Sequence, residues 1–364
     1  MKRILFIINT LGSGGAQRQM VELAIGYKQR GYDVLILEYY RKFSNYYEDY
    51  LAAHNVPIDD IEESNYFKRI WKFRHYMHAY NPDVIIAFLE VSSFIAEMSS
   101  IMSHKWKLIV GERSADPAKK TSKRLRFFLH CHRFADAVVA NSNANIDIIR
   151  EVAPELPESK FHVIYNILDQ TKFTIDPQFK FCTDKKRKLL IASSHRYLKN
   201  LNGLIEAVRL LPEDLRKQLT IDWYGHSKLD DSLIVNTKKV QDYGFEDIFH
   251  FHKDTLEIYE YMRQADAVGL FSYFEGFPNA VCEGMFLAKP IIATAVSDIP
   301  LMLHEDENAF LCQAESPQTI ANALIKFIQS SPEQLEEMGQ RNRKIAEHLF
   351  DKKTILDQYE ALFT

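Results

Sequence analysis

Residues 3–39 read RILFIINTLGSGGAQRQMVELAIGYKQRGYDVLILEY, and they define the repeating unit of the fold. Residues 3–10 form a mostly apolar run, which is typical of a buried strand. Residues 16–30 then show the spacing of an amphipathic helix. The apolar residues on one side of that helix are Met20, Val21, Ala24 and Ile25. Gly31 ends the helix and residues 32–39 form a second strand, so the chain begins as strand, helix and strand.

The same alternation continues through most of the chain. Further strands are expected at residues 82–89, 106–112, 135–142, 188–194, 220–225, 248–252, 267–272 and 290–296. Helices are expected between them, including residues 201–211, a segment near 231–243 and one that begins after Asn279. Strands that alternate with helices predict a parallel sheet covered on both faces. The fold class is therefore α/β.

A chain of 364 residues is too long for one ordinary core, and the alternation is interrupted once. Residues 162–188 lack helical spacing, end in charged residues and are predicted to be a linker. We expect two doubly wound domains that face each other across a cleft. The predicted boundaries are residues 1–168 and 169–346, with residues 347–364 returning to the first domain.

Composition and simple motifs exclude several classes of protein. The net charge of −4 argues against bulk nucleic-acid binding, and we expect no nucleic-acid partner. The four cysteines form no C-x-x-C pair, which favours a reducing cytoplasm. No apolar stretch approaches 18 residues, and the signal-like N-terminus is interpreted as a strand. No D-x-D occurs, and the histidines in HYMH (75–78) and HCH (130–132) are expected to be structural, so no metal site is predicted.

A glycine-rich loop follows the first strand. Gly14 and Gly15 open the helix, where the backbone could approach a phosphate or a sugar. The loop is not a G-x-G-x-x-G fingerprint, because the sixth position counted from Gly12 is Gln17. A dinucleotide-binding interpretation could still use Glu38 to bind a ribose. A plain tight turn is about as plausible as a binding loop.

Two cations lie in the loop after the strand at residues 188–194. Arg196 and Lys199 are three positions apart, so one short loop could direct both toward a diphosphate. The alternative is a pair of ordinary solvated cations before a helix, and this loop taken alone favours that alternative.

The stretch SYFEGFPNAVCEG (272–284) is the most informative for function. Its glycine and proline shape a turn, and backbone N–H groups from Pro278 to Val281 are expected to be free at the helix start, where a phosphate can bind. Glu275 in the loop could accept hydrogen bonds from sugar hydroxyls. Glu283, about one turn into the helix, could reach a ribose. The alternative is two surface glutamates favoured by the helix dipole.

The arrangement from Glu275 to Met285 resembles the E-x7-E region of the family 4 glycosyltransferases, which have the GT-B fold. The resemblance covers nearly the whole chain. The other similar segments are NTLGSGGAQRQMVELA (9–24), ADAVVANSNA (135–144), FHVIYNILD (161–169), SHRYLKNLNGLIEAV (194–208) and DWYGHS (222–227). The chain departs from the family in two places. The loop between Arg196 and Lys199 is shorter than usual, and Glu112 and Arg113 stand where many members carry a histidine.

The resemblance implies a role for each matching residue. Arg196 and Lys199 would hold the diphosphate of a nucleotide-sugar donor, Glu283 its ribose, and Glu275 the transferred sugar. The implied catalytic residues are Glu275, Arg196 and Lys199. Further donor-binding residues are Gly276, Phe277, Pro278, Asn279 and Gly225. Residues on the acceptor side are Gly14, Gly15, Glu112, Arg113 and Asn166. The first domain would then bind the acceptor and the second the donor.

The function implied is retaining transfer of a hexosyl unit from a UDP- or GDP-sugar to a saccharide acceptor in polysaccharide or glycoconjugate synthesis. The acceptor is expected to be lipid-linked. No metal or other cofactor is expected. The alternatives are a nucleotide-sugar epimerase, a non-catalytic nucleotide-sugar-binding protein and an NAD-dependent oxidoreductase.

The segment KKTSKRLRFFLHCHRF (119–134) interleaves basic and apolar residues. It could be an amphipathic helix lying on anionic lipid at the inner face of the plasma membrane. It could equally be a core-facing helix with a solvated basic side. Both interpretations remain open.

Overall fold

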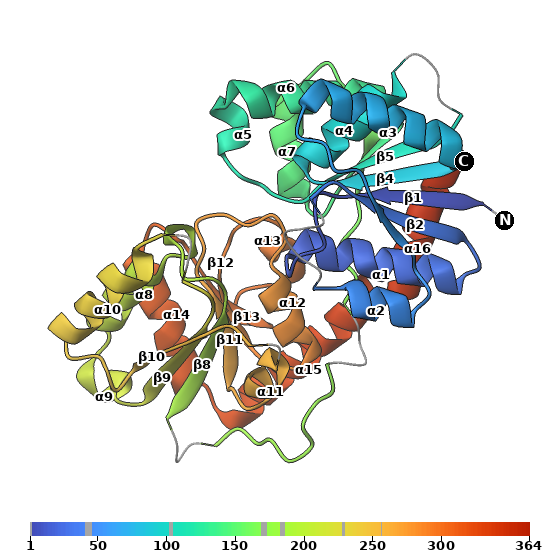
Figure 1. Cartoon of the computed structure of the whole chain (residues 1–364). Helices are drawn as coiled ribbons and strands as arrows, with labels where there is room; N and C mark the ends of the chain where they lie inside the picture. Colours follow the sequence, from blue (N-terminus) through green and yellow to red (C-terminus); the bar gives the residue numbers. More distant parts are fainter. Residues whose placement is uncertain are drawn as a thin grey trace. The chain divides into compact units, whose positions relative to one another are not determined.

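The structure is a computed structural model. The residues it describes are 2–40, 46–101, 105–168, 173–182, 186–227, 230–255 and 257–364. The chain divides into two compact units (Figure 1). Unit 1 comprises Met1–Ile167 and Lys352–Thr364, and unit 2 comprises Leu168–Asp351. The predicted first residue of the second domain, 169, lies outside the described residues.

The sheet of unit 1 is parallel throughout, with strand order β3-β2-β1-β4-β5-β6-β7. Its strands are β1 Arg3–Ile7, β2 Asp33–Glu38, β3 Ile58–Asp60, β4 Val84–Phe88, β5 Lys107–Glu112, β6 Ala137–Ala140 and β7 Phe161–Val163. The prediction of a doubly wound parallel sheet is confirmed. The prediction that residues 162–188 form only a linker is wrong at both ends, since β7 pairs with β6 and β8 begins at Arg187.

Helices cover both faces of this sheet (Figure 1). They are α1 Gly15–Gln29, α2 Glu48–Ala53, α3 Tyr66–Tyr80, α4 Glu90–Ser100, α5 Ala118–Thr121, α6 Lys123–Cys131, α7 Asn143–Val152 and α16 Lys352–Glu360, with 3₁₀ turns η2 His132–Phe134, η3 Glu158–Lys160 and η6 Ala361–Phe363. Alternate residues of β1 serve the two faces. Ile4 and Phe6 pack in a core with α1 and α16, and Leu5 and Ile7 pack in a core with α3, α4 and α7.

The end of the chain belongs to unit 1. The Tyr27 hydroxyl donates to the Leu356 carbonyl at 2.8 Å, and Arg30 forms ion pairs with Asp357 and Glu360 at 2.6 Å each. Gly26 lets α16 approach closely, because a Cβ there would lie 2.7 Å from a Leu356 methyl carbon. The returning segment begins at Lys352, five residues later than the 347 expected from the sequence.

Unit 2 has a six-stranded parallel sheet of order β10-β9-β8-β11-β12-β13. The strands are β8 Arg187–Ala192, β9 Leu219–Tyr224, β10 Phe249–His252, β11 Ala267–Leu270, β12 Ile291–Thr294 and β13 Ala309–Cys312. The helices are η5 Tyr197–Lys199, α8 Leu201–Leu210, α9 Glu213–Arg216, α10 Ser232–Asp242, α11 Ile258–Arg263, α12 Asn279–Phe286, α13 Ile299–Met302, α14 Pro317–Gln329 and α15 Pro332–Leu349.

Both sheets reverse their strand order at one point. In unit 1 the chain moves outward on either side of the pair β1 and β4, and in unit 2 on either side of β8 and β11. Ligands of open α/β sheets bind beyond the carboxyl ends of the strands at such a switch point. Each unit therefore has one preferred edge for a site. Among the described residues, none of the helices is long and apolar enough to cross a bilayer.

Candidate functional site

The predicted donor residues of unit 2 gather at the carboxyl edge of its sheet. Arg196 and Lys199 follow β8, and Glu275 follows β11, so these loops lie on either side of the switch point. Gly225 comes directly after β9, the strand on the other side of β8. The topology thus brings the loop of Arg196 next to the loop of Glu275, although these two residues are 79 positions apart in the sequence.

Lys199 and Glu275 are in direct contact. The Lys199 ammonium donates to Glu275 Oε1 at 2.5 Å, and the Ser272 hydroxyl donates to the same oxygen at 2.6 Å. Both side chains of the ion pair are largely, but not fully, buried. The carboxylate is therefore held in one orientation by a lysine from one side of the switch point and a serine from its own loop. Sequence reasoning singled out Lys199 and Glu275 but neither their contact nor Ser272.

Further contacts join the two loops. The Tyr273 amide donates to the Leu198 carbonyl at 2.9 Å, and the rings of Tyr197 and Tyr273 stack with centroids 5.4 Å apart. The Tyr197 amide donates to Asp230 at 2.9 Å. Burial opposes ionisation of Asp230, but its hydrogen bonds and the nearby charge of Arg196 lower its pKa. Arg196 itself is exposed.

The start of α12 differs in one detail from the expectation of free amides from Pro278 to Val281. Pro278 has no N–H, and the Asn279 amide donates to the Phe277 carbonyl at 3.0 Å. The amides of Ala280 and Val281 lie in the first turn, where a helix offers no acceptor of its own. An anion at this helix start would therefore meet two first-turn amides. Glu283 lies farther along α12 and is buried, so it is not a surface glutamate.

The turn before α12 is fixed by its neighbours. The Ser297 hydroxyl donates to the Gly276 carbonyl at 3.1 Å, and the Thr294 hydroxyl donates to the Ser272 carbonyl at 2.8 Å. Both donors come from the end of β12 and the residues after it. The loop that carries Glu275 is thus held by hydrogen bonds to Ser272, before the glutamate, and to Gly276, after it.

Gly225 allows two strand ends to lie close together. A Cβ at this position would lie 1.9 Å from the Ser193 carbonyl oxygen, which also accepts a hydrogen bond from the Trp223 indole at 2.9 Å. The nearby His195 is buried between Trp223 and Phe251, and burial lowers its pKa. Among the described residues neither ring nitrogen of His195 has a hydrogen-bond partner. Sequence reasoning passed over this histidine.

The glycine loop of unit 1 is bound to Glu38. The Leu11 amide donates to Glu38 Oε1 at 2.5 Å, and Glu38 is fully buried. Gly14 is the N-cap of α1, which begins at Gly15. The alternative interpretation in which Glu38 binds a ribose is therefore wrong, because its carboxylate is fully buried and accepts a hydrogen bond from the glycine loop itself.

Arg113 and Asn166 contact one another within unit 1. The Arg113 guanidinium lies 3.8 Å from the centre of the Phe88 ring, donates to Asn166 Oδ1 at 3.4 Å and also donates to the Tyr359 hydroxyl. Tyr359 belongs to α16. Arg113 therefore links the carboxyl edge of the sheet to the returning C-terminal helix.

Glu112 is the centre of a buried charge cluster at the end of β5. Lys119 donates to Glu112 and lies 3.1 Å from Glu90, and His132 contacts Glu112 at 3.2 Å and Glu97 at 2.6 Å. Burial opposes each charge. The cations nevertheless lower the pKa of Glu112 to about 2, and Glu97 and Glu112 raise the pKa of His132 to about 10. Burial raises the pKa of Glu97, the carboxylate that contacts His132 at 2.6 Å.

Leu89 is a strained residue at the switch point of unit 1. Its φ of 78° and ψ of 150° occur almost only in glycine. It follows β4 directly and precedes Glu90, which pairs with Lys119. Backbone strain of this kind gathers at functional sites, yet no pattern in the sequence reveals it.

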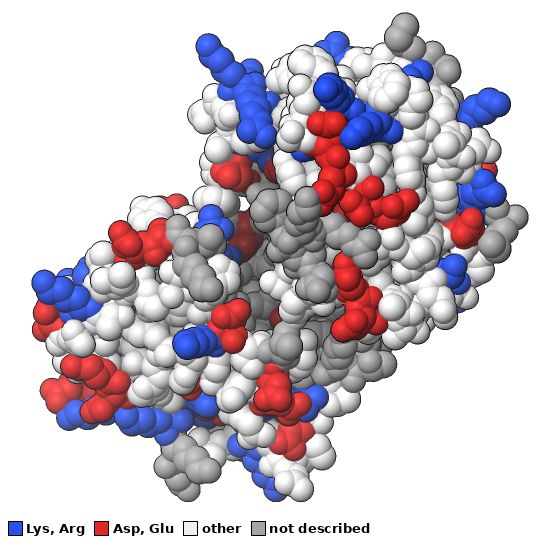
Figure 2. All heavy atoms as spheres, in the orientation of Figure 1, with Lys and Arg blue, Asp and Glu red and all other residues white. Residues whose placement is uncertain are grey.

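The basic segment at residues 119–134 is not one helix. It is divided among α5, α6 and η2, and Lys119 is buried in the cluster around Glu112. Lys119 therefore cannot contact lipid, which corrects part of the predicted membrane surface. The remaining basic residues of the segment are exposed, and Figure 2 shows Lys and Arg side chains over the part of unit 1 where Figure 1 draws α3, α5 and α6.

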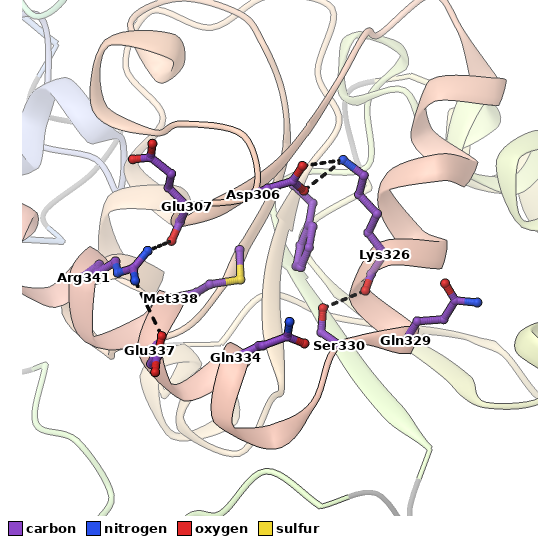
Figure 3. A pocket seen from close by; sticks show the side chains of 10 residues that line it. Asp306, Glu307, Lys326, Gln329, Ser330, Gln334, Glu337, Met338 and Arg341 are labelled. Atoms are coloured by element: carbon purple, nitrogen blue, oxygen red, sulfur yellow. Dashed lines mark hydrogen bonds and ion pairs between the residues drawn. The ribbon is translucent and has the colours of Figure 1, made fainter.

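A second feature of unit 2 lies at the opposite edge of its sheet. A pocket of about 440 Å³ lies between the residues before β13, the end of α14 and the start of α15. Figure 3 shows the side chains that line it. Its charges pair with one another, since Lys326 contacts Asp306 at 2.9 Å and Arg341 contacts Glu337 at 3.6 Å. The pocket lies at the amino edge of the sheet and its charged side chains pair with one another, so it is not part of the candidate site. In the described ranges no group of three His, Cys, Asp or Glu residues could hold a metal ion.

Comparisons with known proteins identify the family and the fold. Residues 173–345 match the family model described as glycosyl transferases group 1, and residues 13–172 match the model described as glycosyltransferase family 4. A similar protein is N-acetyl-alpha-D-glucosaminyl L-malate synthase of Bacillus anthracis, 22% identical over 79% of this chain and 73% of the relative.

Another relative, from Campylobacter jejuni, is an alpha-1,4-N-acetyl-D-galactosaminyltransferase named for a diphospho-undecaprenol-linked saccharide. It is 24% identical over 79% of this chain and 77% of its own length. Among solved structures, Anabaena HepE in complex with UDP aligns with a TM-score of 0.85 and 20% identity, and the alignment covers 99% of each chain. The structural likeness establishes two Rossmann-like units of the GT-B type.

Proposed function

The chain belongs to the family 4 glycosyltransferases of the GT-B fold, and on that premise we propose that it moves a hexosyl unit, with retention of configuration, from a nucleoside diphosphate sugar to a saccharide acceptor. The observation that carries the proposal is the contact between Lys199, Ser272 and Glu275 at the switch point of unit 2. A cation and an oriented carboxylate suit a ligand that joins a diphosphate to a sugar.

The donor would bind at this edge of unit 2. Its diphosphate would be held by Arg196, Lys199 and the first-turn amides of Ala280 and Val281. UDP is the ligand named for the Anabaena structure, which supports a UDP-sugar, and a GDP-sugar would present the same diphosphate. The buried Glu283 would accept hydrogen bonds from the ribose.

Departure of the nucleoside diphosphate places negative charge on its phosphate and positive charge on the anomeric carbon. Arg196, Lys199 and the α12 amides would stabilise the phosphate, and losing one such pre-organised donor typically costs about 10²–10³ in rate. Glu275, held by Lys199 and Ser272, would orient the sugar through its hydroxyls. The leaving phosphate would take the acceptor's proton, so this route needs neither an enzyme nucleophile nor a metal.

Unit 1 would bind the acceptor at the carboxyl edge of its own sheet. Gly14 and Gly15 lie at that edge and Arg113 and Asn166 are bonded within it, whereas Glu112 is buried with Lys119 and His132 and would support the edge without contacting the acceptor. The Campylobacter relative is named for an undecaprenol-linked saccharide, which supports a lipid-linked acceptor here. Such an acceptor would bring the protein to the inner face of the plasma membrane.

The test is a screen of UDP- and GDP-hexoses for donor hydrolysis and for transfer to a saccharide acceptor. Glu275→Gln should fold normally and lose at least about 100-fold in transfer rate, because the amide cannot hold the same hydrogen bonds. Glu213→Gln, an exposed change in the same unit, is the matched control and should keep full activity. Normal transfer by Glu275→Gln, or formation of an epimerised nucleotide sugar without transfer, would overturn the proposal.

A further inference from the structure

The outer face of α3 carries large aromatic side chains that the fold of unit 1 does not use. Phe67 is 85% exposed and Trp71 is 60% exposed, and their spacing of four residues places them on one side of the helix. The inner side of α3 supplies Phe73 and Met77 to the core, so the helix is already anchored. Exposed rings of this size on a fixed helix indicate an interaction surface.

Helix α6 extends this surface. Phe127 is 53% exposed, whereas the neighbouring Phe128 is buried. Phe94 of α4 joins the helices, because its ring lies 5.7 Å from Phe127, 4.8 Å from Phe128 and 5.9 Å from Tyr66 of α3. Tyr66 and Phe128 thus belong to one apolar cluster, which connects α3 and α6 through α4.

The rings are accompanied by cations. Lys68 of α3 and Lys123, Arg124 and Arg126 of α6 are exposed and form no ion pair with any of the described residues. The Arg124 guanidinium lies 5.4 Å from the centre of the Phe128 ring, so this cation borders the apolar cluster that also contains Tyr66 of α3. Figure 2 shows Lys and Arg side chains over this part of unit 1. The face therefore carries both exposed rings and exposed cations.

We propose that Phe67, Trp71 and Phe127, with Lys68, Lys123 and Arg124 around them, form a docking surface for an anionic lipid bilayer. Trp and Phe favour the boundary between headgroups and acyl chains, and cations beside them attract anionic headgroups. The surface keeps part of the segment 119–134 expected from the sequence, namely the exposed side of α6, and adds Phe67, Lys68 and Trp71 of α3, which the sequence did not point to. The inference rests on the proposed function in one respect: membrane binding would bring the enzyme to a lipid-linked acceptor.

The experiment uses the full chain and vesicles of phosphatidylcholine with or without about a third phosphatidylglycerol. Of the three tryptophans, Trp106 and Trp223 are buried, so a change in tryptophan emission on binding reports Trp71. We expect sedimentation with anionic vesicles, weaker sedimentation at high salt, a blue shift of the emission, and quenching by brominated lipid. Binding without any change at Trp71 would contradict the proposed surface.

Two variants separate the contributions of rings and charges. Phe67→Ser/Phe127→Ser should lower vesicle binding at least 10-fold, and Ile234→Ser/Val235→Ser is the matched control, since these two residues are exposed apolar side chains of α10 in unit 2. Lys68→Gln/Lys123→Gln/Arg124→Gln should lower binding roughly 100-fold, because each cation near an anionic surface contributes a factor of about 5.

Donor hydrolysis is measured in parallel without vesicles, which distinguishes the two proposals. A chain that hydrolyses a nucleotide sugar but ignores anionic vesicles would overturn the docking surface and leave the proposed function intact. A chain that binds vesicles through Trp71 yet hydrolyses no donor would overturn the proposed function and leave the docking surface intact. If the Phe67→Ser/Phe127→Ser variant binds vesicles like wild type, or if these changes only dissolve a dimer of the chain, the docking surface is wrong.

Discussion

Replacing Lys119 with methionine should destabilise unit 1, although a count of charges places this lysine in a basic surface segment. Its side chain is only 2% exposed and lies between the carboxylates of Glu112 and Glu90. Methionine keeps most of the volume but removes the charge. Glu112, equally buried, would then have His132, at 3.2 Å, as its one remaining cationic partner among the residues that the structure describes.

The expected cost follows from breaking one side of a buried ion pair, which is typically about 3–5 kcal/mol. In a domain of this size each kcal/mol lowers the melting temperature by about 2–4 °C, so a decrease of roughly 6–20 °C is expected. Lys123→Met is the matched control, because Lys123 is exposed and its loss should change stability by less than about 0.5 kcal/mol.

Calorimetry at pH 7 and pH 5 measures both variants. Lys119 keeps the pKa of Glu112 low in the wild type, so this carboxylate stabilises the fold above its unfolded pKa of about 4.3 and the contribution is lost as the pH falls. Without Lys119, burial would favour protonated Glu112, and the deficit of the variant should shrink at pH 5. Equal melting temperatures for Lys119→Met and Lys123→Met at pH 7 would refute the buried cluster.

Three further changes have definite expected outcomes. Gly225→Ala should cost about 1–3 kcal/mol in thermal unfolding and weaken UDP binding measured by titration, because the new methyl group would overlap the Ser193 carbonyl; unchanged binding would remove Gly225 from the donor site. In the wild type, the free energy of unfolding should fall between about pH 6.5 and pH 10, because a histidine with a raised pKa stabilises the fold only while it is protonated; His132→Gln should remove this decrease. If denaturant titrations give wild type and variant the same dependence of unfolding free energy on pH, the prediction is wrong. Gly26→Val should lower the unfolding free energy of unit 1 by about 1–3 kcal/mol by displacing Leu356, and an unchanged midpoint would show that the C-terminal helix is not packed there.

The regular part of the fold was accessible from the sequence because its signals are local. β1, α1 and β2 are adjacent and strongly patterned, and their parallel pairing follows from the alternation. β3 escaped prediction, since three residues show no period, and β7 was concealed in a segment interpreted as a linker. The start of the C-terminal segment that belongs to unit 1 was predicted five residues too early, because α15 of unit 2 continues through Leu349 and ends only there.

The candidate site was predicted as residues but not as contacts. Glu275 and Lys199 stand out by their motifs, yet their hydrogen bond joins positions 76 apart and requires the strand order of unit 2. Lys119 has the same charge as its exposed neighbours, and only the fold reveals that it is buried. The strained backbone of Leu89 and the buried ring of His195 likewise depend on three-dimensional packing.

The most direct test is a crystal structure of the full chain with a nucleotide sugar. The pyrophosphate should lie within hydrogen-bond distance of Arg196, Lys199 and the first amides of α12, with a hydroxyl of the sugar on Glu275. A pyrophosphate bound at the amino edge of either sheet, or in unit 1, would contradict the account.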